Sequence, residues 1–185
     1  MEPLGHEHED DLRAAAGDAA IWQWMMLDGS TPDGFLTWFA QTLGDERAGT
    51  SAAFATVDSE TGRAIGSTRY LSLRPEHRGL EIGYTWVEPA AWGSGANVEA
   101  KLLMLEHAFE RLGCMRVEFK TDARNERSRA ALAALPAQFE GVFRKHMLLH
   151  AGRVRDSAYY AIVDEDWPDV KSALERRLEA KLATH

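Results

Sequence analysis

The sequence is poor in cysteine and lacks long apolar runs. Cys114 is the single cysteine among 185 residues, which excludes a disulfide within the chain and fits a reducing compartment. Although 45% of the residues are hydrophobic, no run approaches the roughly 20 residues that cross a membrane. The first residues, MEPLGHE, are too acidic and polar for a signal peptide. We therefore expect one cytoplasmic domain with no membrane partner.

Cationic side chains are also scarce. The 21 Lys and Arg residues are outnumbered by 29 Asp and Glu residues, which gives a formal net charge of −8. This balance argues against sequence-independent nucleic-acid binding and would modestly attract a cationic amine. His6, His8, Glu9 and Asp10 are metal-ligating types, but acidic residues favour a helix start. We expect a solvated helix start there, with no metal, and a buried, inert Cys114.

The order of apolar and turn-forming residues predicts an α/β fold, with a mixed, mostly antiparallel sheet flanked by helices. Thr31 followed by Pro32 is typical of a helix start, and Gly113 is typical of a helix end. The expected buried helix face after the central loop carries Val98, Leu102, Leu105 and Phe109. Helices are expected over about 7–28, from 32, over 97–112, from 125 to 136 and over 167–182. Strands are expected over about 51–57, 64–73, 81–87, 115–121, 138–150 and 153–163, with Met115, Val117 and Phe119 facing inward.

The most informative stretch runs from Leu80 to Lys101. A buried strand, 81–87, is closed by Pro89 and followed by the small-residue connection AAWGSGAN before a helix. The two glycines let backbone amides turn toward one point beside the positive end of the helix, which suits a pyrophosphate. No Lys or Arg lies in the connection, so we expect a main-chain grip. An ordinary turn with positive φ explains a Gly-x-Gly equally well. The P-loop and Rossmann fingerprints are absent.

These features resemble the GNAT N-acetyltransferases, in particular their RimJ/RimL-like branch, over roughly residues 3 to 178. The segment from Trp92 to Asn97 is similar to the family motif Gln/Arg-x-x-Gly-x-Gly/Ala, although Trp92 and Asn97 depart from it. The strand start EIGY and the segment NERS from Asn125 also resemble this branch. The resemblance implies a single GNAT (acyl-CoA N-acyltransferase) domain over residues 1–185 that uses acetyl-CoA. It also implies a first strand that is short or absent here, and it leaves a homodimer open.

The resemblance further implies which residues hold the cofactor. The strand backbone at Tyr84, Thr85, Trp86 and Val87 would pair with the pantetheine arm and polarise the thioester carbonyl. Asn125 and Ser128 would lie beside the pantetheine and the thiol. The pyrophosphate loop would comprise Trp92, Gly93, Ser94, Gly95, Ala96, Asn97 and Val98. One of Arg124, Arg127 and Arg129 would contact the phosphates of CoA, unless all three form a solvated helix face.

Catalysis needs a base for the amine and an acid for the leaving thiolate. Glu81 is the first candidate base; the alternative is a structural pairing with Arg69 or Arg78. Glu118 is a second candidate, against a solvated strand face.

Ser128 is the candidate acid, against a local capping role. Tyr159 and Tyr160 are expected to be core or wall residues. Trp22, Trp24 and Trp38 are expected to line the substrate cleft or to belong to the core.

The function implied is an N-acetyltransferase that moves an acetyl group from acetyl-CoA to a primary amine, either a protein N-terminus or a small molecule. The amine would attack directly in a ternary complex, because no cysteine is placed for an acyl-enzyme. The competing interpretation is a non-catalytic acyl-CoA-binding or regulatory module, which would keep the loop and strand but lack a working base.

Overall fold

Local signals in the sequence set where the helices begin and end in the computed structural model, which describes residues 1–183. The Thr31 side chain accepts a hydrogen bond from the Gly34 amide at 3.1 Å and caps α3 (Pro32–Arg47). Asn125 caps α5 (Glu126–Ala133) in the same way. Gly113 adopts φ 64° after α4 (Ala96–Glu106) and its π-helical extension (His107–Arg111). The predicted starts at Thr31 and Asn125 and the predicted end at Gly113 are confirmed.

The remaining elements follow the expected order. The other helices are α1 (Glu9–Ala15), α2 (Ala19–Trp22) and α6 (Trp167–Leu182), with 3-10 turns at 6–8, 75–77, 89–91 and 150–152. The strands are β1 (Glu2–Pro3), β2 (Ala52–Val57), β3 (Ala64–Arg74), β4 (Gly79–Val87), β5 (Arg116–Asp122), β6 (Gln138–Leu148) and β7 (Val154–Val163). The first strand, expected to be short or absent, is present as the two residues of β1.

The strands form one mixed sheet in the order β1-β2-β3-β4-β5-β7-β6. β1 and β3 both pair antiparallel with β2, and β7 pairs antiparallel with β5. β4 runs parallel to β5, in a register that joins Gly79–Glu81 to Arg116–Glu118. The predicted mixed, mostly antiparallel sheet flanked by helices is confirmed.

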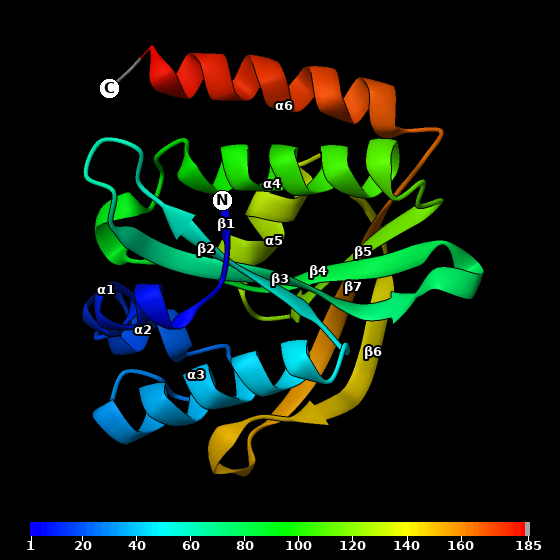
Figure 1. Ribbon diagram of the computed structural model, residues 1–185. Coiled ribbons are helices and arrows are strands. Elements are labelled where there is room, and N and C mark those ends of the chain that lie inside the picture. The colour runs from blue at the N-terminus through cyan, green and yellow to red at the C-terminus, as the bar shows by residue number, and fades with distance from the viewer. Residues whose placement is uncertain (184–185) are drawn as a thin grey trace. The chain divides into compact units, whose positions relative to one another are not determined.

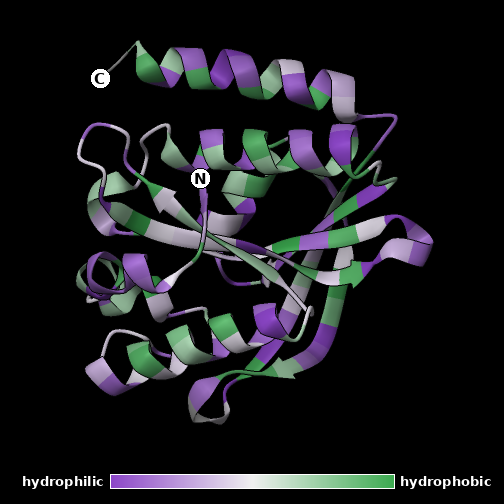
Figure 2. Ribbon diagram, viewed as in Figure 1, coloured by the Kyte–Doolittle hydropathy of each residue, from purple (hydrophilic) through white to green (hydrophobic). Residues whose placement is uncertain are grey.

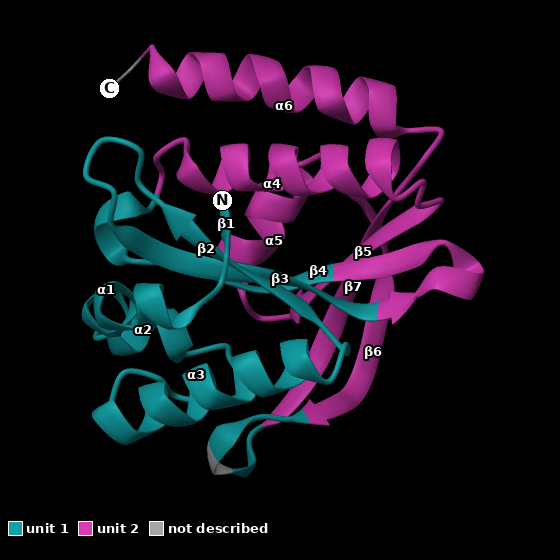
Figure 3. Ribbon diagram, viewed as in Figure 1, with its two compact units in different colours: residues 1–72, 82–92, 148–153 teal, residues 73–81, 93–147, 154–185 magenta. Residues whose placement is uncertain are grey.

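Contacts divide the chain into two compact units, which Figure 3 colours separately. The first unit comprises residues 1–72, 82–92 and 148–153. It contains α1, α2 and α3, and α3 packs on β2. Hydrophobic and hydrophilic residues alternate along α3 (Figure 2), as expected of a helix with one buried face. Its core is rich in aromatic rings, among them Trp22, Phe35, Trp38, Phe39 and Trp86.

The second unit comprises residues 73–81, 93–147 and 154–183 of the described chain. Within it α6 packs along α4 (Figure 1). Its buried side chains include Val98, Leu105, Phe109, Val117, Phe119, Ile162 and Leu174.

Two expectations about burial in the second unit are wrong. Leu102 is only half-buried, and Lys101 and Met104 occupy the buried face of α4 instead. The rotation of the helix brings positions 98, 101, 104 and 105 inward together, a 3.6-residue period in which Leu102 falls at the edge. Met115 is 43% exposed, because β5 begins one residue later at Arg116.

The N-terminal acidic segment also differs from expectation at one residue. His8 is buried, and its Nδ1 accepts a hydrogen bond from the Gly5 amide at 3.1 Å. Its Nε2 lies 3.2 Å from a Glu2 carboxylate oxygen. Since these contacts close the turn before α1, His8 has a structural explanation in the fold. Among residues 1–183, no helix is both long enough and apolar enough to cross a membrane.

Candidate active site

The glycine loop leads into α4 in the second unit. Gly93 has φ 82°, a conformation that L side chains rarely adopt, and Gly95 occupies the N-cap position with φ −71°. The Ala96 amide donates to the Ser94 hydroxyl oxygen at 3.2 Å. Asn97 and Val98 also lie in the first turn, where backbone N–H groups have no acceptor within the helix. The loop therefore combines a left-handed glycine with helix amides at one end of α4.

A cation from the end of the chain reaches this loop. The Lys181 ammonium, on the last turn of α6, donates a hydrogen bond to the Gly93 carbonyl. An ammonium has three donors and uses one of them here. The sequence predicts a main-chain grip at the loop, because the loop itself contains no Lys or Arg. Lys181 lies 88 positions after Gly93 in the sequence, so no local pattern indicates that the two residues meet.

Strand β4 contains a backbone distortion in its middle, in the first unit. Tyr84 has φ 49°, and such left-handed backbone is an outlier for a bulky side chain. Strain of this kind gathers at functional sites. The Thr85 hydroxyl lies 2.7 Å from that of Thr68 on β3, and Trp86 is buried.

At the end of β4, the Trp92 indole N–H donates to the Val87 carbonyl at 3.0 Å. One lone pair of that carbonyl is therefore already used, and the other remains for a second donor.

Glu81 is buried, and an oxygen of its carboxylate lies 2.8 Å from the Lys120 ammonium. The alternative had named Arg69 or Arg78 as the partner. Arg78 instead donates to the Gly113 carbonyl at 2.7 Å, and Arg69 donates to Thr42. A structural ion pair of Glu81 is therefore real, but its cation comes from β5.

Glu118, the second candidate base, is held by two arginines. Arg74 and Arg116 each approach its carboxylate to 2.8 Å. Burial disfavours the ionised carboxylate, but the hydrogen bonds from Arg116 and Arg74 outweigh it and lower the pKa of Glu118. A carboxylate with a lowered pKa and two cationic partners is a weak base, and Glu118 does not lie on a fully solvated face.

Asn125 and Ser128 lie together at the start of α5. The Ser128 amide donates to the Asn125 side chain at 3.0 Å, so the capping group is Asn125. Of the neighbouring arginines, Arg124 forms an ion pair with Asp122 at 3.0 Å. Arg129 donates to the Tyr160 hydroxyl at 3.1 Å. The side chain of Arg127 is exposed.

The three predicted substrate tryptophans have different surroundings in the first unit. Trp22 is 1% exposed, and its indole donates to the Ala16 carbonyl at 2.8 Å, which makes it a core residue. Trp24 is half-buried, with the Arg153 guanidinium 5.0 Å from its ring centre. Trp38 lines a pocket of about 50 Å³ together with Arg69 and Tyr84. The pocket therefore includes only one of the three.

Cys114 and the histidines give no sign of a reactive or metal-binding centre. Cys114 is buried, and burial raises the pKa of its thiol, which agrees with an inert side chain. Within residues 1–183, no three His, Cys, Asp or Glu side chains lie close enough together to hold a metal ion. Tyr160 is buried, as a core residue would be. Tyr159 is half-buried, with its hydroxyl 3.4 Å from His146 Nε2.

Comparisons with known proteins agree on one family. The family model described as an acetyltransferase (GNAT) domain matches residues 1–138. The chain is 32% identical over 104 residues to the uncharacterized N-acetyltransferase YoaA of Bacillus subtilis (strain 168). That alignment covers 56% of this chain and 58% of the relative, so the chain spans little more than half the length of that protein.

Solved structures extend the likeness to almost the whole chain. A GCN5-related N-acetyltransferase from Brucella melitensis shares 29% identity with a TM-score of 0.88, covering 96% of this chain and 80% of that one. A candidate acetyltransferase from T. thermophilus shares 37% identity with a TM-score of 0.86, covering 96% and 92%. Mycobacterium smegmatis RimJ, solved with CoA-disulfide, shares 21% identity, which supports the common fold alone; its TM-score is 0.78 over 95% and 87% of the two chains.

Proposed function

The chain belongs to the acetyltransferase (GNAT) family, and on that basis we propose that it transfers an acetyl group from acetyl-CoA to a primary amine. The observation that carries the proposal is the loop from Gly93 to Val98, where a left-handed glycine precedes the amides of α4. The match to the family model includes this loop. The RimJ/RimL-like branch, a cytoplasmic setting and a homodimer remain parts of the proposal that rest on the sequence argument.

The loop has the chemistry that a pyrophosphate needs. The helix end carries partial positive charge, and the amides of Asn97 and Val98 lie in its first turn. Lys181 adds an ammonium that is already fixed on the Gly93 carbonyl. The Asn97 Oδ1 atom is buried and has no hydrogen-bond partner among the described residues. A buried acceptor without a partner is costly; a pyrophosphate has no donor to offer it, but an amide N–H of a pantetheine arm would remove that cost. The residues at the loop therefore fit a CoA-type ligand.

In the proposed reaction, the amine nitrogen attacks the thioester carbonyl carbon. The new C–N bond forms as the C–S bond breaks; the amine loses one proton and the sulfur gains one, so the products are an amide and a free thiol. The backbone of β4 around Tyr84 would polarise the carbonyl. Glu81 would take the amine proton through a water, and Ser128 would return a proton to the sulfur. The Lys120 ammonium contacts the Glu81 carboxylate, so in this proposal Lys120 would hold the base in place.

Isothermal titration with acetyl-CoA and with CoA tests the ligand, and thiol release with a panel of amines tests the reaction. Gly95→Glu places a carboxylate where the phosphates are proposed to bind, and Gly95→Ala is its matched control. In both variants the new Cβ would lie 3.2 Å from Leu178 Cδ1, so the control shares that contact and lacks the carboxylate. We expect wild type and Gly95→Ala to bind and Gly95→Glu to lose binding. Absence of wild-type binding at millimolar acetyl-CoA would refute the proposal.

The non-catalytic alternative is separated by Glu81→Gln. An enzyme should keep acetyl-CoA binding in this variant and lose most of its turnover, whereas a binding module has no turnover to lose. Thiol release by the wild type that Glu81→Gln leaves unchanged would keep the transferase and remove Glu81 from the mechanism.

A further inference from the structure

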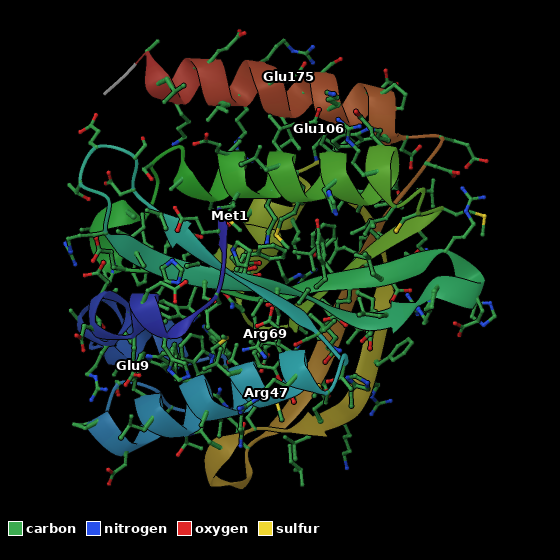
Figure 4. The ribbon with its side chains drawn as sticks, in the orientation of Figure 1. Met1, Glu9, Arg47, Arg69, Glu106 and Glu175 are labelled. Atoms are coloured by element: carbon green, nitrogen blue, oxygen red, sulfur yellow. The ribbon has the colours of Figure 1, made fainter. Side chains whose placement is uncertain are left out.

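A small pocket in the first unit contains an arginine whose hydrogen bonds are incomplete. Arg69, on β3, is 4% exposed, and its side chain lines the pocket of about 50 Å³ beside α3 (labelled in Figure 4). One terminal nitrogen donates to the Thr42 hydroxyl at 2.6 Å. Its Nε is buried and has no hydrogen-bond partner among the described residues. The pocket therefore has a buried cation with at least one donor to spare.

A second donor on the same pocket is also unpaired. Trp38 is 2% exposed and lines the pocket, and its indole Nε1 has no partner within the described part of the chain. The Thr42 hydroxyl donates to the Trp38 carbonyl at 2.7 Å and accepts from a terminal nitrogen of Arg69, and it is not the partner of either unpaired nitrogen. Buried donors without acceptors cost free energy. Both unpaired nitrogens belong to side chains that line this pocket, so an acceptor group placed there would relieve that cost.

The charge of Arg69 is only loosely balanced by the protein. A carboxylate oxygen of Asp45 lies 3.5 Å from a guanidinium nitrogen, and the Asp45 side chain is 54% exposed. An ion pair with a hydrated partner contributes little, and burial lowers the pKa of Arg69 even with Asp45 nearby. The Tyr84 ring lies 4.5 Å from the guanidinium and fixes its orientation. The cation is held in place but not neutralised.

From this geometry we propose that the pocket binds the carboxylate of the acceptor, which would be a small amine that also carries a carboxylate, such as an amino acid. An arginine fork matches a carboxylate in shape and charge, and about 50 Å³ has room for a group of that size. Tyr84 links this pocket to the reaction, since its ring lies against Arg69 while its backbone belongs to β4. This inference rests on the proposed acetyl transfer, and it favours a small acceptor over a protein N-terminus.

The test compares matched substrates across variants. Glycine, L-alanine and L-phenylalanine are each assayed against the corresponding amide by thiol release, and the acid-to-amide ratio of kcat/KM is taken for every protein. Comparing this ratio between proteins cancels the difference in amine basicity. Gln41→Glu adds a negative charge at an exposed pocket residue, and Ala40→Glu adds the same charge next to it, outside the lining. We expect Gln41→Glu to lower the ratio at least tenfold through KM for the acids, and Ala40→Glu to leave it unchanged.

Arg69→Lys keeps the charge but loses the fork, and it should lower the same ratio. Since Arg69 is buried, this variant is interpreted only if its melting temperature shows that it folds; Gln41→Glu decides the question otherwise. An unchanged ratio in Gln41→Glu would overturn the proposal and leave water as the occupant of the pocket.

A binding arm separates this inference from the proposed function. N-acetyl-L-alanine and N-acetyl-L-alaninamide are titrated calorimetrically into each protein in the presence of CoA. Selective binding of the acid that Gln41→Glu abolishes, without thiol release from any amine, would refute the transferase and keep the carboxylate pocket. Thiol release with no dependence on the carboxylate would keep the transferase and refute the pocket.

Discussion

Lys101 gives a prediction whose size follows from its burial. It lies on the inner face of α4, beside Met104 and Leu105, and is 7% exposed. Burial lowers the pKa of its ammonium from 10.5 to about 7. Since one pKa unit corresponds to about 1.4 kcal/mol, keeping this amine charged in the fold costs on the order of 5 kcal/mol. We expect Lys101→Met, which keeps an unbranched chain of similar length, to raise the free energy of unfolding at pH 7 by several kcal/mol.

The stability difference between Lys101→Met and wild type should depend on pH. The unfolded amine binds a proton at every pH below about 10.5, whereas the folded amine does so only below about 7. Between these values unfolding takes up a proton, so wild-type stability rises with pH by about 1.4 kcal/mol per unit from this group. The penalty is complete below pH 7 and is gone above 10.5. The advantage of Lys101→Met over wild type should therefore shrink steadily from about pH 7 to about pH 10.

Urea unfolding followed by tryptophan fluorescence measures both effects at about pH 6, 7, 8 and 9. Lys145→Met, at an exposed position of β6, is the matched control and should show no pH-dependent difference from wild type. An advantage of Lys101→Met that stays constant with pH, or a variant less stable than wild type at neutral pH, would refute the burial of a titrating amine at this position.

Two further predictions concern the loop. Gly93→Ala should lower the free energy of unfolding by about 1 kcal/mol and weaken acetyl-CoA binding, because Gly93 has φ 82°. The control is Gly44→Ala in α3, where an added Cβ meets open space; it should raise the free energy of unfolding by about 0.5–1 kcal/mol. Urea unfolding measures the stability of both variants. A destabilised Gly93→Ala that binds acetyl-CoA with full affinity would show that the loop does not hold the ligand. Lys181→Met should raise the Kd for acetyl-CoA about tenfold, because the charge-assisted hydrogen bond proposed from its ammonium to a phosphate, about 1.5 kcal/mol, would be lost. The effect should be smaller in high salt, which screens the charge. An unchanged Kd in titrations at low salt would remove Lys181 from the phosphate site.

The elements that were predictable depend on neighbouring residues. Thr31 with Pro32 and the left-handed Gly113 act within one helical turn, and each lies where the sequence predicts. α5 likewise begins after Asn125, where a helix start is predicted. The alternation along β5 correctly marks Val117 and Phe119 as buried. The fold class follows from such signals, because element order and period restrict how the layers can form.

The pairings of the candidate site could not be predicted in this way. Glu81 meets Lys120 across 39 residues, and Arg69 meets Thr42 across 27. No local pattern encodes which of several basic residues will face a given carboxylate, since sheet order and register decide it. Glu81 was accordingly assigned the wrong cation. The buried Lys101 was missed because a lysine in an amphipathic pattern is read as a surface residue.

Tyr84 connects the proposed acceptor pocket to the strained backbone of β4. Left-handed backbone at a bulky residue costs on the order of 1–3 kcal/mol and persists only where its surroundings enforce it. The stacking of Arg69 on the Tyr84 ring is one such restraint, and Thr42 fixes the arginine in turn. A carboxylate on Arg69 would tighten that restraint and, through Tyr84, the backbone proposed to polarise the thioester. Acceptor binding would then help to organise the groups that act on the acetyl donor, so that one residue serves both substrates.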